Sequence, residues 1–226
     1  MVDLRAPGVS VRDERHLNGA SHFSHVVFDG LRVPDADRVG AVNDGWRTAL
    51  TTLMYERFFV GAWGSSGAFG GPQLVHLTAL ARESTVNGRP ALQDAGVRAR
   101  IARLAVREAA IRHMSYRVLT TVSQGGIPGP EGSIVKMEVA HLAEDIANFG
   151  LELMGPQALL YGEAAPHAGI FQAALLENPC MRIAGGTDEI QRTIIAERLL
   201  GMPQETHVPR DVPFRDLPRG GGFRPD

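Results

Sequence analysis

Apolar residues recur at intervals of three and four along most of this 226-residue chain, from about Asp44 onward. This spacing places them on one face of an α-helix and predicts successive helices that pack together. Clusters of glycine and proline separate these segments, because both residues favour turns over helix interiors. The predicted helices cover about 44–63, 73–83, 97–122, 131–154, 167–176 and the segment after Gly185.

Three of the predicted helix ends depend on local signals. A glycine- and serine-rich stretch at 64–71 is expected to kink or end the first helix, and Gly155-Pro156 is expected to end the fourth. The short helix from about His167 to Leu176 is expected to end before Pro179, since proline lacks the N–H that a helix interior needs. The chain is therefore expected to be mainly α, an up-and-down helical bundle.

A small β-fragment is predicted in front of the helices. Strand-forming residues occur at Val9 and Val11 and again from Phe23 to Phe28, with a turn signal at Asn18-Gly19. Two or three strands do not form a stable sheet by themselves in water, so this fragment needs a partner. The expected regions are a β-fragment over 1–40, a helical bundle domain over 41–203 and a polar, disordered tail over 204–226.

The segment from Gly185 to Gly201 has the features of a helix with an open N-terminus. Thr187 is a suitable N-cap, and the two acids after it suit the positive end of the helix dipole. The preceding pair of glycines lets the backbone approach another group closely, so this helix start can receive an anionic or polar ligand. The apolar stripe of the helix consists of Ile190, Ile194, Ile195 and Leu199.

Composition and charge argue against several classes of function. A net charge of −2 gives no reason to expect nucleic acid or a membrane surface as a partner. No apolar run reaches the length of a membrane span, and the single cysteine, Cys180, excludes an internal disulfide and fits a reducing, cytoplasmic environment. The eight histidines have no metal-ligand spacing, so no metal site is expected.

The predicted third helix carries six arginines. They form either a solvent-exposed face, which is the favoured interpretation, or an anion site. These arginines are at positions 98, 100, 103, 107, 112 and 117.

The sequence resembles the acyl-CoA dehydrogenase family. The pattern GGT-x-EIQR-x-IIAER from Gly185 onward is similar to the flavin-contacting C-terminal helix of that family. The segments at 9–12, 23–34 and 39–46 resemble the family's passage from its middle β-domain into its C-terminal helical domain. The match begins in the middle of the family pattern, so the N-terminal helical domain and most of the β-domain are expected to be missing from this chain.

The resemblance implies α,β-desaturation of an acyl-CoA thioester, in which a carboxylate removes the α-proton and the β-carbon gives a hydride to FAD. In much of the family the glutamate base directly precedes the Gly-Thr of the last helix, where this chain has Gly185. Some members carry the base on the first helix of the C-terminal domain, just before an arginine. Glu56 matches that position, and Arg57 by the same resemblance lies on the substrate side of the pocket.

The residues around Glu56 support a catalytic role independently of the resemblance. Leu53 and Val60 lie three and four residues away, so Glu56 falls on an apolar helix face. Desolvation on such a face favours the protonated carboxyl, as a general base near neutral pH requires. The alternative is an ordinary ion pair of Glu56 with Arg57 or Arg47, in which case Arg57 is a structural cation.

The resemblance also implies cofactor contacts. The residues that match FAD contacts at the last helix are Gly186, Thr187 and Glu189. Arg82 matches the arginine of an Arg-x-x-Phe-Gly motif that reaches the flavin diphosphate of a neighbouring subunit, and Gly155 is what remains of a Gln-x-x-Gly-Gly turn. Glu152 stands where that turn has its glutamine, and an acid is a poor neighbour for a diphosphate.

Two functions follow from the resemblance. The first is part of a flavin-dependent acyl-CoA dehydrogenase of fatty acid or lipid metabolism, with an acyl-CoA substrate, FAD, and an electron-transfer flavoprotein as electron acceptor. The second is a non-catalytic accessory or structural subunit that packs with a complete acyl-CoA dehydrogenase. A homo- or hetero-oligomer is expected in both cases, because exposed faces of the bundle and of the β-fragment need a partner.

Overall fold

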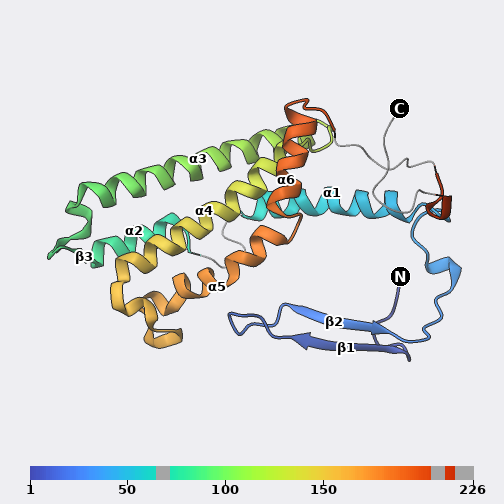
Figure 1. Ribbon diagram of the computed structural model, residues 1–226, viewed down its shortest axis with the longest axis horizontal. Helices are drawn as coiled ribbons and strands as arrows, with labels where there is room; N and C mark the ends of the chain where they lie inside the picture. The colour runs from blue at the N-terminus through green and yellow to red at the C-terminus, as the bar shows by residue number, and fades with distance from the viewer. Residues whose placement is uncertain (65–71, 205–211, 217–226) are drawn as a thin grey trace.

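The computed structural model describes residues 1–64, 72–204 and 212–216 of the chain. Helices dominate it, and two short antiparallel β-ribbons accompany them (Figure 1). The strands are β1 (Val9–Glu14), β2 (Phe23–Phe28), β3 (Thr85–Val86) and β4 (Arg89–Pro90). The α-helices are α1 (Gly45–Gly64), α2 (Leu74–Glu83), α3 (Ala95–Ser123), α4 (Glu131–Met154), α5 (Ile170–Ile183) and α6 (Asp188–Ile194). Short turns of helix are η1 (Asp35–Asp37), η2 (Ala91–Gln93), η3 (Gly155–Leu159), η4 (Gly162–Ala164), η5 (Pro166–Gly169), η6 (Ile195–Leu199) and η7 (Phe214–Asp216).

The predicted mainly α fold is confirmed, and α1 to α4 agree with the predicted helices to within a few residues. Helix α1 ends at Gly64, where the glycine- and serine-rich stretch begins, but the rest of that stretch lies outside the described residues. Most of the predicted disordered tail over 204–226 also lies outside them. No helix in the described ranges is long and apolar enough to cross a membrane.

Helix α4 is the centre of the bundle. It packs against α1, α2, α3, α5 and α6, and its neighbours α3 and α5 run antiparallel to it (Figure 1). The core formed in this way buries Ile111 of α3, Phe149 of α4 and Phe171 of α5. Helices α4 and α5 approach closely at Gly150, because a Cβ there would overlap the ring of Phe171. The rows of apolar residues read from the sequence therefore converge on one central helix.

The helix predicted over about 167–176 is wrong at both ends. His167 and Ala168 have left-handed backbone conformations (φ 52° and 53°), so the α-helix begins only at Ile170. At the other end α5 continues through Pro179 to Ile183, where the N–H of Ala184 still donates to the carbonyl of Cys180. The packing of α5 along α4 offsets the one hydrogen bond that proline cannot make.

Strands β1 and β2 lie in the predicted β-fragment and pair as an antiparallel hairpin, with Val9 opposite Phe28 and Glu14 opposite Phe23. The hairpin lies beside the helices (Figure 1) and is attached through its turn. Asn18 donates to the carboxylate of Glu177 on α5, and its carbonyl accepts a 2.8 Å hydrogen bond from the hydroxyl of Tyr161. Apolar residues of the hairpin, Phe23 and Phe28 among them, remain more than half exposed.

Two of the six arginines on α3 do not belong to a merely solvated face. Arg100 pairs with Glu152, and Arg107 pairs with both Glu138 and Asp145, so both arginines tie α3 to α4. The hydrogen bond to Glu152 raises the pKa of Arg100 above its ordinary value. The interpretation of this helix face as solvent-exposed therefore holds for only part of it. Acidic residues of α4 determine which arginines are paired, and the sequence pattern of α3 does not reveal these partners.

Candidate functional site

The start of α6 is capped as the sequence predicts. Thr187 has an extended backbone, and its hydroxyl oxygen accepts a 3.3 Å hydrogen bond from the N–H of Ile190. The carboxylate of Glu189 accepts hydrogen bonds from its own N–H and from the Thr187 hydroxyl, which lower its pKa below the ordinary value. These hydrogen bonds hold the N-terminal groups of the helix in place.

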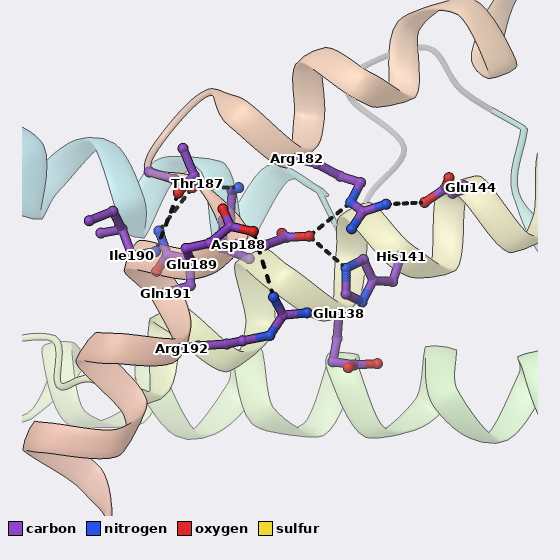
Figure 2. A network of polar contacts seen from close by, with 12 residues as sticks. Glu138, His141, Glu144, Arg182, Thr187, Asp188, Glu189, Ile190, Gln191 and Arg192 are labelled. Carbon is purple, nitrogen blue, oxygen red and sulfur yellow. Dashed lines mark hydrogen bonds and ion pairs between the residues drawn. The ribbon is translucent and has the colours of Figure 1, made fainter. Parts of the chain in front are cut away.

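The acid beside the cap, Asp188, is the buried member of a polar cluster (Figure 2). One of its carboxylate oxygens accepts from Arg182 Nε at 2.8 Å and contacts His141 Nε2 at 2.9 Å, and Arg182 also donates to Glu144 at 3.2 Å. The side chain of Asp188 is only 3% exposed. Burial alone would raise the pKa of Asp188, but the hydrogen bonds from His141 and Arg182 lower it below its ordinary value. The carboxylate is therefore kept charged inside the protein.

The two glycines before the cap form a tight turn with a backbone conformation that favours glycine. Gly185 and Gly186 both have positive φ, 66° and 96°, a region that residues with a Cβ rarely adopt. A Cβ at Gly186 would also overlap the amide nitrogen of Gln191. That amide donates to the carbonyls of Gly185 at 2.9 Å and Gly186 at 3.3 Å.

A buried lysine contacts the same turn from the central helix. Lys136 of α4 is 2% exposed, and its ammonium donates a 2.7 Å hydrogen bond to the carbonyl of Gly186. Burial lowers the pKa of Lys136, the charge of Asp188 opposes this effect, and the charge of Arg182 adds to it. The turn is thus held by donors from α4 and from α6 itself.

The face that α6 turns toward the protein is polar. Its buried residues are Asp188 and Gln191, whereas Ile190 of the predicted apolar stripe is 53% exposed and Leu199 in the following π-turn is 39% exposed. The apolar stripe exists in the sequence, but the described residues of this chain do not bury its first and last members, Ile190 and Leu199. Hydrogen bonds to α4, rather than apolar packing alone, seat the beginning of α6.

Glu56 lies on α1, and its side chain is exposed in this chain. The desolvation expected from its apolar neighbours is therefore not provided by the described residues, and Leu53 beside it is also 44% exposed. Arg47, one of the suggested ion-pair partners, donates from Nε to Asp44 at 2.7 Å instead. The backbone of Arg57 belongs to α1, but its side chain lies outside the described parts of the structure.

The remaining predicted cofactor residues lie apart from α6. Arg82 is exposed near the end of α2, and Gly155 follows the end of α4 with φ +55°. Figure 1 shows both of these helix ends at one extremity of the bundle, away from the start of α6. The structure therefore brings together Gly186, Thr187 and Glu189 and separates them from Arg82 and Gly155.

Sequence reasoning missed the residues that support the α6 turn. Lys136 and His141 lie on α4, about 50 residues before Gly186 in the sequence, and Arg182 lies near the end of α5, just before the turn. A signal existed for one of them, since a lysine in the middle of an otherwise apolar helix face is seldom buried without a partner. Nothing in the sequence identified which carbonyl that partner is.

Helices α1 to α6 lie within a segment that matches known proteins. A sequence profile described as "Acyl-CoA dehydrogenase, C-terminal domain" matches residues 43–200. "Acyl-CoA dehydrogenase FadE34" from Mycobacterium tuberculosis is 32% identical over 204 residues, which are 90% of this chain and 26% of that protein. "Acyl-CoA dehydrogenase IpdE1" from the same organism is 32% identical over 207 residues, 91% of this chain and 50% of that protein.

Solved structures share the fold. The "Tcur3481-Tcur3483 steroid ACAD" superposes with a TM-score of 0.77 at 24% identity. The match covers 90% of this chain and 51% of the chain in that structure. The "ChsE4-ChsE5 complex from Mycobacterium tuberculosis" gives a TM-score of 0.75 at 24% identity, over 90% of this chain and 52% of its own. The chain thus spans from about a quarter to about half the length of the proteins it matches.

Proposed function

Because the chain belongs to the acyl-CoA dehydrogenase family, as the match of residues 43–200 to the C-terminal domain shows, we propose that it supplies that domain to a flavin-dependent acyl-CoA dehydrogenase. The observation that carries the proposal is the start of α6. There a glycine turn, a threonine cap and an acidic residue are fixed next to one another by Lys136, Gln191 and the Asp188 cluster.

The groups at this turn fit FAD. The turn has no side chain at Gly185 and Gly186, the N–H groups of Gly186 and Thr187 have no acceptor among the described residues, and the Glu189 carboxylate can accept from a hydroxyl group. Gly186, Thr187 and Glu189 would contact the nucleotide. Arg82 and Gly155, at the other extremity of the bundle, would contact the diphosphate of a flavin held by a neighbouring subunit. FAD supplies the acceptor for the hydride that leaves the β-carbon of the acyl group.

Glu56 is the proposed base. Its carboxylate would take the proton from the α-carbon while the β-carbon loses a hydride, so that a double bond forms between these two carbons and the thioester stays intact. Arg57, one residue further along α1, would lie on the thioester side. Glu56 is exposed here, so a partner surface has to exclude water from this part of α1 before the carboxylate becomes an effective base.

The exposure of apolar residues on α1 supports an oligomer as the active form. Trp46 is 73% exposed and Tyr55 58% exposed on the helix that also carries Glu56. Patches of this kind mark surfaces that associate with another protein. We propose as partner another acyl-CoA dehydrogenase chain, in a homo- or hetero-oligomer, with an acyl-CoA as substrate, an electron-transfer flavoprotein as electron acceptor and the cytoplasm as location.

A second candidate is supported by the same exposure of apolar residues on α1. In that case the chain is an accessory subunit, which packs against a complete acyl-CoA dehydrogenase and contributes contacts to its flavin but no base. Gly185, at the position where much of the family has its glutamate, is compatible with both candidates.

The first experiment is a visible absorption spectrum of the purified protein, alone and after incubation with FAD. A retained flavin with a perturbed spectrum supports the proposal, and bleaching of that spectrum by an acyl-CoA supports the dehydrogenase function. Glu56→Gln should abolish the bleaching and leave the bound flavin, whereas Glu108→Gln on α3, a matched carboxylate change, should leave both. Bleaching that survives in Glu56→Gln excludes Glu56 as the base, whereas a bound flavin that no acyl-CoA bleaches favours the accessory function.

A further inference from the structure

Both carbonyls of the glycine turn are directed into the protein. The carbonyl of Gly185 accepts from Gln191 at 2.9 Å, and that of Gly186 accepts from Lys136 at 2.7 Å and from Gln191 at 3.3 Å. The two donors are among the most buried polar side chains described, with 2% of Lys136 and 0% of Gln191 exposed. The interior therefore fixes the direction of two successive peptide groups.

That direction determines where the amide protons point. In a trans peptide group the C=O and the N–H of the next residue point in opposite directions, and the described chain contains no cis peptide bond. The N–H groups of Gly186 and Thr187 therefore point away from Lys136 and Gln191. Within the described ranges neither N–H has an acceptor. Two neighbouring donors are thus presented on the side of the turn that faces away from the core.

We propose that Lys136 is a positioning residue for this turn: by holding the Gly186 carbonyl inward, it directs the N–H groups of Gly186 and Thr187 toward acceptor atoms of FAD. The identity of the ligand rests on the proposed function. The direction of the two N–H groups does not, because it follows from the contacts of the turn alone.

Lys136 and Gln191 have different parts in this arrangement. Gln191 lies on α6, five residues after Gly186, so its hydrogen bonds join the turn only to the helix that follows it. Lys136 lies on α4, 50 residues away from Gly186 in the sequence, and its hydrogen bond joins the turn to the central helix. The bond from Lys136 is also charge-assisted and shorter than the one from Gln191 to the same carbonyl.

The Asp188 carboxylate completes the arrangement. It is the first residue of α6, and Arg182 and His141 hold it against α5 and α4. Its negative charge favours the protonated form of Lys136, which is the form that can donate to Gly186. The turn and the start of α6 are thus secured at two points, one on each side of Thr187.

The test compares Lys136→Met with Leu142→Ala. Both changes lie on α4 and affect buried side chains, but Leu142 belongs to the apolar core, and the hydrogen bonds of the turn come from Lys136 and Gln191. Titration with FAD, followed by the flavin absorption spectrum, gives the dissociation constant. The ¹³C chemical shift of the Gly186 carbonyl, measured without FAD, reports its hydrogen bond. If Lys136→Met does not fold, Lys136→Gln serves as the second variant.

The expected result is an upfield shift of the Gly186 carbonyl and a loss of about tenfold in FAD affinity, as expected for one charge-assisted hydrogen bond. Leu142→Ala should leave the carbonyl shift and the FAD affinity near those of the unchanged protein. Equal loss of affinity in both variants overturns the proposal. If the unchanged protein binds no FAD, the proposed function fails, and the carbonyl shift alone then decides whether Lys136 positions the turn.

Discussion

Glu152 is bound by Arg100, whose Nη2 donates to one carboxylate oxygen at 2.9 Å and whose Nη1 contacts the other. The same guanidinium lies 4.1 Å from the centre of the Phe149 ring. The acid that stands in place of the family's glutamine is therefore neutralised from α3. Its charge is a weaker obstacle to a nearby diphosphate than the sequence alone suggested.

Glu152→Gln should change stability little. The side chains of Arg100 and Glu152 are 35% and 56% exposed, and ion pairs of this kind contribute about 0–1 kcal/mol. Arg100→Met should cost more, because it also removes the contact with Phe149, worth about 0.5–1 kcal/mol. Urea unfolding of the two variants measures the difference. A larger loss in Glu152→Gln than in Arg100→Met would contradict this order.

Two glycines of α4 should respond oppositely to alanine. At Gly150 the added methyl group overlaps the ring of Phe171, so Gly150→Ala should cost about 1–3 kcal/mol through overpacking. At Gly132 nothing lies within 4 Å of the new atom, and alanine should stabilise the helix by up to about 1 kcal/mol. Thermal unfolding measures both changes. Equal effects would show that the contact between α4 and α5 is looser than described.

The two glycines of the turn should differ in a similar way. Gly185→Ala suffers only the cost of a left-handed backbone, about 1–2 kcal/mol, since the nearest neighbouring atom is Lys136 Cε at 3.9 Å. Gly186→Ala has φ of 96° and also overlaps Gln191, so its loss should be clearly larger. Urea unfolding gives the comparison. The inward direction of the Gly186 carbonyl is doubtful if Gly186→Ala is the milder change.

Asp188 should contribute stability that disappears in acid. Its pKa in the folded protein lies below the ordinary value of 3.8, because hydrogen bonds from His141 and Arg182 outweigh the effect of burial. The unfolded chain therefore takes up a proton at a higher pH than the folded one. The stabilisation is complete above pH 3.8 and is lost as the pH falls through the lower, folded pKa.

The measurement is the unfolding free energy of the unchanged protein and of Asp188→Asn as a function of pH. Above pH 3.8 the variant should be less stable by about 1–2 kcal/mol, discounted for the partial exposure of Arg182. The gap should narrow at lower pH. Asp29→Asn, a change of an exposed aspartate, serves as the control and should show no such gap. A gap that widens toward acid would reverse the assigned sign.

The sequence predicts the limits of some helices and strands and not those of others. The limits of α4 could be predicted because its apolar spacing is regular and Gly155 ends it. The limits of α5 could not, since packing against α4 carries that helix through Pro179. The Asn87-Gly88 pair between β3 and β4 is a strong hairpin signal, and both residues have positive φ as such a turn requires.

The sequence by itself determined the order of the helices, the hairpin, the Thr187 cap and the family, because each depends on neighbouring residues or on an ungapped pattern. The tertiary structure alone decided what surrounds those residues. It joined Lys136 to Gly186 and His141 to Asp188, and it left Glu56 exposed on α1. Side chains that are distant in the sequence meet only when helices pack, and local periodicity specifies which face is apolar but not which partner covers it.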